Sequence, residues 1–161
     1  SDNIARLKQA GLILFASCDT GSGERTYLAQ IQAGCFDSLA LNLNFCHDAA
    51  LSRVVPEAAK AGMAVVCREA FMKGALFSIG EEAGISDRTD LVCAALRWNL
   101  SRDGVSTTLV GAENVDHLRA HLSAAEKPKP EPADEQLLDR LRQTASYTVY
   151  KEQRKKRFLS E

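Results

Sequence analysis

Four short apolar runs, separated by segments with helical periodicity, limit most strongly how this 161-residue chain can fold. The runs are residues 12–16, 39–45, 63–67 and 105–110. Short apolar runs that alternate with helices are typical of parallel sheets with right-handed crossover connections. We therefore predict an α/β fold with a parallel sheet. An open doubly wound sheet and a barrel segment both satisfy this pattern, and periodicity alone does not separate them.

The clearest unit is residues 91–122, which read as helix, turn, strand, loop and helix. Asp103-Gly104 is a strong turn signal, and residues 105–110 are expected to form a strand buried on both faces. Asn114 is expected to cap the next helix, because its side chain can accept a bond from a free backbone N–H. Such a helix start offers N–H groups and a positive dipole end to an anion, for example a nucleotide phosphate. An ordinary strand-to-helix connection explains the same residues, since one glycine in such a loop is a weak signal.

Residues 39–45 alternate strictly between large apolar side chains and a second set, which is Ala40, Asn42 and Asn44. In a barrel, one face of such a strand meets the helices and the other faces the interior. The two asparagines near the strand end therefore indicate either a polar site or side chains that bond the neighbouring backbone.

Two of the helical segments carry interruptions. Pro56 falls within residues 49–61 and is expected to kink that helix or to mark a restart. Residues 76–90 contain two glycines, four acids and one arginine, which predicts a mobile loop or a shortened helix. Residues 4–10 look like the end of a helix whose start is missing, so the chain is expected to begin partway through a larger fold.

The chain is expected to have three parts. Residues 1–125 hold the βα units, residues 126–133 form a stiff, extended Pro-rich linker, and residues 134–161 form a C-terminal helix with a basic tail. The tail has two interpretations: a contact with a phosphate or an acidic partner, or a solvated and partly disordered segment. Its composition favours the second.

Charge and cysteine content exclude several classes of function. The net charge of −1 gives no global field that would attract nucleic acid or a membrane. No apolar run approaches the roughly 20 residues of a membrane helix, and the first residues lack a basic-then-apolar signal pattern. The five cysteines are odd in number, lie mostly in apolar segments and form no CxxC pair. Reduced, buried thiols in a cytoplasmic protein are therefore expected, rather than disulfides or a metal site.

Four stretches carry a more specific pattern. They are LKQAGLILFASCD (residues 7–19), VVCREAFMKGALF (65–77), AALRWNLSRDGVSTTLVGAENVDHLRAHL (94–122) and ADEQLLDRL (133–141). Together they resemble the C-terminal half of an aldo/keto reductase, a family with an eight-stranded (β/α) barrel that uses NAD(P)H. The resemblance reaches to about residue 144. It implies that the chain holds strands five to eight, which is about four βα units or half of a TIM-like barrel.

The resemblance places no catalytic residue in this chain. The family's catalytic aspartate, tyrosine, lysine and histidine lie on loops after strands two, three and four, which have no counterpart here. His47 follows the sixth strand and does not match the catalytic histidine.

The resemblance does imply a cofactor-binding side, since the phosphate sites of such barrels lie near the last two strands. Ser17 matches the serine that helps to hold the nicotinamide amide, and Arg68 matches the position whose ring often stacks on the nicotinamide. Phe71, Lys73 and Gly74 match the loop that runs along the pyrophosphate.

Further matches lie toward the adenosine end. Gly111 and Ala112, just before Asn114, match the approach to the adenosine phosphate. His117 stands where many members have an arginine, and His121 lies where an amide often contacts the adenine.

Other positions depart from the family pattern, and these are Cys18, Ala40 and Ala120.

Two functions follow as hypotheses. The chain is the cofactor-binding half of an NAD(P)H-dependent oxidoreductase that reduces carbonyls to alcohols, completed by a missing N-terminal half, a second copy or another chain. Alternatively, it is a non-catalytic structural or interaction subunit derived from that scaffold. In either case a half barrel leaves two edge strands with unpaired backbone groups, so we expect a dimer or a docked partner.

Overall fold

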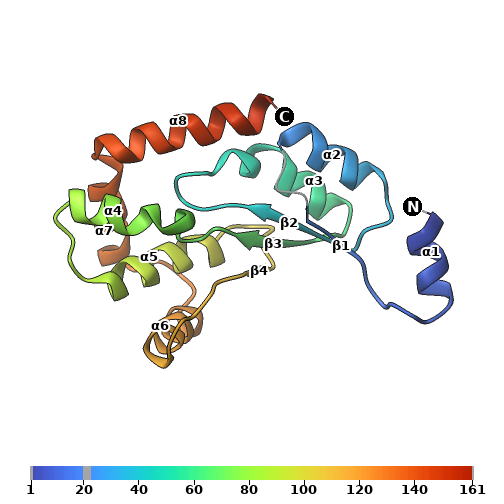
Figure 1. The fold of residues 1–161 in the computed structure, drawn as a ribbon, viewed down its shortest axis with the longest axis horizontal. Coiled ribbons are helices and arrows are strands. Elements are labelled where there is room, and N and C mark those ends of the chain that lie inside the picture. Colours follow the sequence, from blue (N-terminus) through green and yellow to red (C-terminus); the bar gives the residue numbers. More distant parts are fainter. Residues whose placement is uncertain (1, 20–22, 161) are drawn as a thin grey trace.

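Four parallel strands form one sheet in the order β1-β2-β3-β4, which is also their order along the chain. The computed structural model describes residues 2–19 and 23–160, and its strands are Ser17–Asp19, Ser38–Asn42, Ala64–Arg68 and Thr107–Thr108. An open doubly wound sheet reverses its strand order at a switch point, whereas the strands of a (β/α) barrel follow one another in sequence order. The order seen in Figure 1 therefore confirms the α/β fold and selects the barrel segment over the open sheet.

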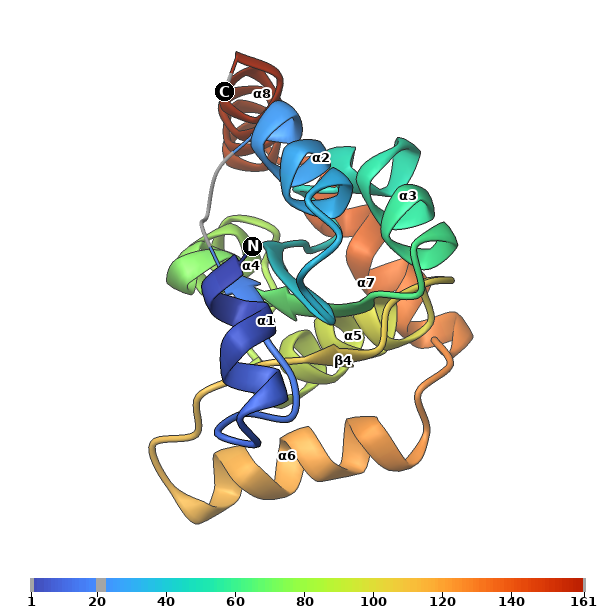
Figure 2. The same ribbon diagram turned by 90° about the vertical axis from the view of Figure 1, so that its right-hand side faces the viewer.

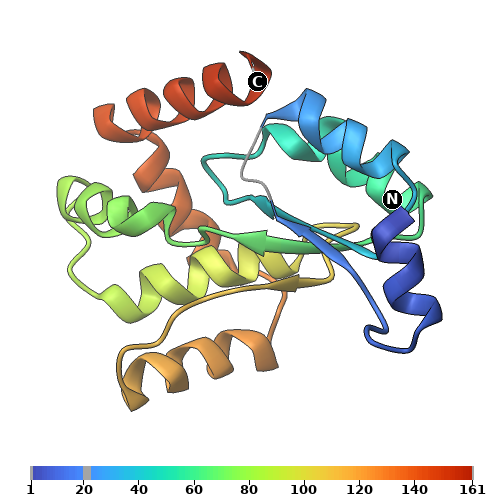
Figure 3. The ribbon, with the colours of Figure 1, turned by 45° about the vertical axis from the view of Figure 1, so that its right-hand side comes forward.

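Helices connect the strands. Before the sheet lies α1 (Asp2–Gln9), β1 and β2 are connected by α2 (Glu24–Gln32), and β2 and β3 by η1 (Ala49–Ser52) with α3 (Val54–Lys60). The connection from β3 to β4 holds η2 (Met72–Gly74), α4 (Ala75–Glu82) and α5 (Arg88–Leu100). After β4 come α6 (Val115–Glu126), α7 (Pro132–Arg142) and α8 (Ala145–Ser160). In Figures 1, 2 and 3, α8 and α6 lie at opposite ends of the molecule, and the sheet lies between them.

The hydrophobic core is centred on β2 and β3. Leu39, Leu41 and Leu43 are fully buried and Phe45 is 2% exposed, which confirms the burial expected of this apolar set. The strand itself is shorter than the predicted residues 39–45, because β2 ends at Asn42. Asn44, two residues beyond the end of β2, is also buried, and its amide donates to the Glu69 carbonyl at 2.9 Å. Its Oδ1 accepts from the backbone N–H groups of the two residues that follow Phe45. For this asparagine, the interpretation that it bonds the neighbouring backbone is confirmed.

The first strand lies later in the chain than predicted. Residues 12–16 are not a strand, and three of their side chains are among the most exposed apolar ones: Leu12 (71%), Leu14 (81%) and Phe15 (77%). The strand begins at Ser17 because this is the residue that pairs with Ser38, the first residue of β2. Before that point the chain has no neighbouring strand to pair with.

The fourth strand is shorter and less buried than predicted. Only Thr107–Thr108 pairs with β3, Thr107 is exposed, and Leu109 is 56% exposed. In the described sheet β4 is an edge strand, because it pairs with β3 alone. The expectation of burial on both faces is wrong, since that burial requires a further strand and its helix.

Both interrupted helical segments are explained by local chemistry. The predicted restart is confirmed, because η1 ends at Ser52 and α3 begins at Val54. Pro56 then lies in the first turn of α3, where its missing N–H costs no helical bond. Within residues 76–90 the shortened-helix alternative is confirmed, because α4 ends at Glu82 and residues 83–87 are not helical. Asp87 then caps α5, and its side chain accepts from Thr89 N–H at 2.7 Å.

The expectation of a partly disordered tail is wrong, because α8 is a helix that packs on the barrel segment, although most of its side chains are exposed. It runs from α7 to α2, across the loop that follows β2 (Figures 1 and 3). Tyr147 and Phe158 are its buried residues. The Tyr147 hydroxyl donates to the Phe45 carbonyl at 3.2 Å, and the Phe158 ring lies 6.2 Å from the Tyr27 ring. These two buried aromatic side chains, one near each end of α8, hold the helix on the barrel segment. The many basic residues around them gave no indication of this packing.

All five cysteines are free thiols, and all but Cys35 are buried. Burial raises the pKa of Cys46 and Cys67 to about 12, so both stay protonated and unreactive at neutral pH. Within residues 2–19 and 23–160, no helix is long and apolar enough to cross a membrane. The same residues contain no group of three or more His, Cys, Asp or Glu side chains that could hold a metal ion.

Candidate functional site

A cleft of about 610 Å³ opens beside the carboxyl ends of β3 and β4. One wall is the turn after β3 with the start of α4, and another is the start of α5. The third wall is the loop after β4 together with the first half of α6. A volume of this size is in the range of small-molecule sites, which usually lie between a few hundred and about 1,000 Å³.

The turn after β3 is held in an unusual backbone conformation. Glu69, Met72 and Lys73 all have positive φ angles, of 59, 56 and 57°, although none of them is glycine. Gly74 follows with φ 91°. Such conformations cost about 1 kcal/mol or more each and cluster at binding sites, where the surrounding structure enforces them. Here the turn brings the side chains of Phe71 and Lys73 into the lining of the cleft.

Three rings in the lining of the cleft lie close together. The Phe71 ring lies 5.4 Å from the His121 ring and 6.3 Å from the Phe77 ring. The Arg88 guanidinium, also in the lining, lies 5.2 Å from the centre of the Phe77 ring. Offset aromatic and cation–π arrangements of this kind form a surface on which a planar heterocycle can stack.

The start of α6 is built as predicted. The Asn114 side chain accepts from His117 N–H at 2.9 Å, which confirms the cap. The Leu118 N–H donates to the Asn114 carbonyl as the first bond of the helix. The amides of Val115 and Asp116 precede that bond and belong to the N-terminal groups that a helix cannot satisfy internally.

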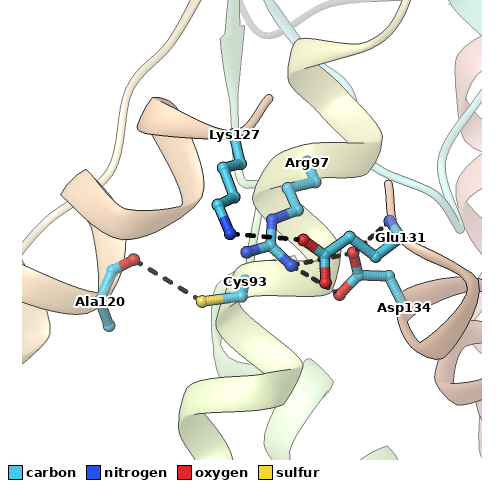
Figure 4. A network of polar contacts seen from close by, with 6 residues as sticks. All are labelled: Cys93, Arg97, Ala120, Lys127, Glu131 and Asp134. Carbon is cyan, nitrogen blue, oxygen red and sulfur yellow. Dashed lines mark hydrogen bonds and ion pairs between the residues drawn. The ribbon is translucent and has the colours of Figure 1, made fainter. Parts of the chain in front are cut away.

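Packing against α5 positions the α6 wall of the cleft. The Cys93 thiol on α5 donates to the Ala120 carbonyl at 3.7 Å, and Ala120 lines the cleft (Figure 4). His121, one residue later, is 8% exposed. Burial, and then the neighbouring His117, lower the pKa of His121, so this imidazole is neutral at pH 7.

Both basic side chains of the cleft are already ion-paired. Lys73 lies 3.1 Å from Glu69, which also lies 3.5 Å from Arg154 on α8. Arg88 lies 3.4 Å from Glu81 on α4. Glu69 therefore joins the cleft to the helix that crosses the loop after β2.

The cleft brings together six of the ten residues that the sequence suggested, namely Phe71, Lys73, Gly74, Gly111, His117 and His121. Asn114 acts as the helix cap, and Ala112 is exposed outside the lining.

Two further suggested residues lie elsewhere. The Arg68 side chain is directed toward β1, where it pairs with Asp19. Ser17 is in register with the first residues of β2 and β3, at the amino end of the sheet, and is exposed.

Sequence reasoning missed several lining residues, and these are Glu69, Phe77, Arg88, Thr89, Val92, Leu109, Val110, Glu113 and Asp116. Glu113 and Asp116 flank Asn114, so their place beside the helix start could have been read from the cap. Arg88 and Thr89 come from a different βα unit, and only the packing of α5 against α6 brings them to this site.

The fold is that of half of an aldo-keto reductase barrel. The chain is similar to the aldo-keto reductase AKR11C1 from Bacillus halodurans in its holo form, with a TM-score of 0.65 and 21% sequence identity. The match covers 87% of this chain and 52% of that one. For the apo form of the same protein the TM-score is 0.64 at 21% identity, with 87% and 55% of the two chains covered. The chain thus spans about half the length of the structures it matches.

No protein-family model and no curated protein sequence matches the chain. At 21% identity the similarity to the solved structures concerns the fold. It confirms the predicted resemblance at that level: four parallel strands that alternate with helices correspond to half of a (β/α)8 barrel.

Proposed function

We propose that the chain is the nucleotide-binding half of an aldo-keto reductase-type oxidoreductase, which uses NAD(H) or NADP(H) to reduce carbonyls to alcohols. The observation that carries this proposal is the cleft. Six residues that the resemblance selected for cofactor binding line a single space beside the last two strands. In (β/α) barrels that is the usual place of a phosphate site.

The lining suits the adenosine and pyrophosphate end of the nucleotide. The rings of Phe71, Phe77 and His121 can hold a planar base. Lys73 and the first amides of α6 can hold phosphate oxygens. The open space around Gly111, where a Cβ would meet no atom within 4 Å, lets a ligand approach the backbone closely.

The nicotinamide end depends on residues outside this chain. When bound, the cofactor supplies a hydride to the carbonyl carbon, and a positioned acid must protonate the oxygen. The chain contributes binding and orientation, while the acid comes from a completing segment. That segment is an N-terminal barrel half, a second copy or another protein chain.

A non-catalytic interaction subunit is the second candidate. The exposed Leu12, Leu14 and Phe15 beside the edge strand β1 favour it, because large apolar side chains gathered at a sheet edge mark association surfaces.

Titration with NADH and NADPH separates the two candidates. We expect saturable enhancement of nucleotide fluorescence, and we expect Phe71→Ala and Lys73→Ala to weaken binding about tenfold. Lys60→Ala is the matched control, since Lys60 is an exposed lysine of α3 that is paired with Glu57 and lies outside the cleft. Absence of binding at millimolar nucleotide contradicts the proposal and leaves the interaction subunit.

A further inference from the structure

The last helix, α8, reaches the wall of the cleft through a single carboxylate. The resemblance to the aldo/keto reductases extends to about residue 144, so it assigns no role to this helix. Lys151 of α8 lies 3.2 Å from Asp48 in the loop after β2. Arg154, about one turn further along, lies 3.5 Å from Glu69 in the turn after β3. Glu69 belongs to the lining of the cleft, whereas Arg154 does not.

The Glu69 carboxylate is shared unequally between two cations. Its Oε1 lies 3.1 Å from the Lys73 ammonium, and its Oε2 lies 3.5 Å from the Arg154 guanidinium. Bonds between a guanidinium and a carboxylate are usually about 2.7–2.9 Å long, so Arg154 is within reach but not fully engaged. Oε2 is buried and has no hydrogen-bond partner in the described part of the chain. The carboxylate thus keeps an unused acceptor on the side of α8.

The two cations also differ in burial. The Lys73 side chain is 62% exposed, while those of Glu69 and Arg154 are only 14% and 18% exposed. An exposed ion pair contributes little, because water and salt weaken it, whereas a buried pair interacts more strongly. Glu69 can therefore release Lys73 at small cost, provided that Arg154 takes up its charge. An anion in the cleft requires that release, since the carboxylate both occupies Lys73 and repels the anion.

We propose that Lys73 and Arg154 compete for Glu69, so that Arg154 is a positioning residue that frees Lys73 for an anion in the cleft. For the pyrophosphate of a nucleotide this inference rests on the proposed function. It goes beyond that function by giving α8 a part in binding. Coupling between two sites is reciprocal, so an anion at Lys73 must in turn strengthen the attachment of α8.

Fluorescence titration with NADH tests the competition. Arg154→Met keeps an apolar stem beside the Tyr150 ring, which lies 4.9 Å from the guanidinium, and should weaken NADH binding about fivefold. Glu69→Gln frees Lys73 and should tighten binding about fivefold. Added to Glu69→Gln, the Arg154→Met change should alter the affinity by less than about twofold, because the carboxylate for which the cations compete is gone.

Two variants serve as controls. Arg154→Lys retains the positive charge and should keep the NADH affinity within about threefold of the wild type. Lys151→Met removes a cation of α8 that pairs with Asp48 instead of Glu69, and should leave the affinity within about twofold. Circular dichroism melting checks that all variants are folded.

Hydrogen exchange of the α8 amides provides a measurement that needs no ligand. Lys73→Met leaves Glu69 to Arg154 alone, so we expect exchange in α8 to slow at least about twofold relative to the wild type. Saturating NADH should have the same effect on the wild type and no effect on α8 in Arg154→Met.

The outcomes separate this inference from the proposed function. Equal NADH affinities of the wild type and Arg154→Met overturn the inference and leave the proposed function intact. The same is true if Arg154→Met causes equal losses with and without Glu69→Gln, since Arg154 would then act directly through its charge. If NADH does not bind, the proposed function fails, and the ligand-free exchange decides the inference. Slower α8 exchange in Lys73→Met then supports the competition, and unchanged exchange overturns it.

Discussion

Arg97 on α5 and Asp134 in the first turn of α7 form a buried ion pair that fixes the two helices to each other. The guanidinium Nη1 donates to both carboxylate oxygens, at 3.1 and 3.0 Å, and the two side chains are only 11% and 9% exposed. The same carboxylate accepts from Glu131 N–H at 2.7 Å as part of a capping box (Figure 4). One acidic side chain thus both starts α7 and attaches it to the helix behind the cleft.

Loss of this carboxylate should be costly. We expect Asp134→Ala to lower the free energy of unfolding by about 3–5 kcal/mol, because it leaves the Arg97 charge buried and unpaired. Urea denaturation measures the change. The double variant Arg97→Met/Asp134→Leu should lose much less than the sum of the two single variants. Asp139→Ala, which breaks an exposed pair with Arg142, should cost no more than about 1 kcal/mol. An equal cost for Asp134→Ala and Asp139→Ala would refute the role of the buried pair.

Two glycines allow backbone strain to be separated from crowding. Gly104 and Gly62 have similar positive φ angles, of 83 and 70°. A Cβ on Gly104 would lie 2.8 Å from Val55 Cγ1, whereas one on Gly62 would meet nothing within 4 Å. Gly62→Ala should therefore cost about 1 kcal/mol of strain, and Gly104→Ala about 1–3 kcal/mol more. Thermal unfolding of the two variants checks this difference, which Gly104→Ala/Val55→Ala should reduce.

Stability should fall as the pH drops below neutrality. His47 is buried, its ring lies edge-on at 5.8 Å from Phe158 of α8, and neither ring nitrogen has a hydrogen-bond partner in the described part of the chain. Burial, and next the Arg154 charge, lower the pKa of His47 below its usual 6.5. Below about pH 6.5 the unfolded chain therefore binds protons that the folded chain does not. The free energy of unfolding therefore decreases as the pH falls from about 6.5 toward the pKa of His47 in the folded chain.

Urea unfolding at pH 7.5 and pH 5.0 tests this dependence, in a range where the carboxylates remain ionised in both states. His47→Leu keeps an apolar contact with Phe158 and removes two unpaired polar atoms. We expect a smaller loss of stability at pH 5.0 in this variant than in the wild type. A wild-type chain that is equally stable at both pH values would contradict the prediction.

The exposed apolar residues beside β1 should promote association. Leu12, Leu14 and Phe15 lie next to a strand that pairs only with β2 in the described sheet. We expect the chain to form dimers or to dock on a partner, and changing all three residues to serine should weaken that association at least about tenfold. Light scattering against concentration measures it. Leu159→Ser, an exposed leucine of α8, is the control, and a monomeric wild-type chain would count against the prediction.

Helix starts could be predicted where the chemistry is local. The Asn114 cap depends on a bond to a residue three positions away, and the restart before Pro56 depends on a missing N–H. The alternation of leucines in β2 likewise predicted its buried face, because side-chain direction follows residue parity along a strand.

The sequence by itself thus determined the parallel α/β order, the start of α6 at its Asn114 cap, the helix restart before Pro56 and six residues of the cleft. Only the tertiary structure decided that β1 starts at Ser17, that Arg68 turns toward Asp19, and that α8 packs on the loop after β2. Only packing also brought Arg88 to the cleft with the start of α6. The reason is physical: caps and strand parity are set by neighbours in the chain, whereas burial, register and charge pairing depend on residues that come close only after folding.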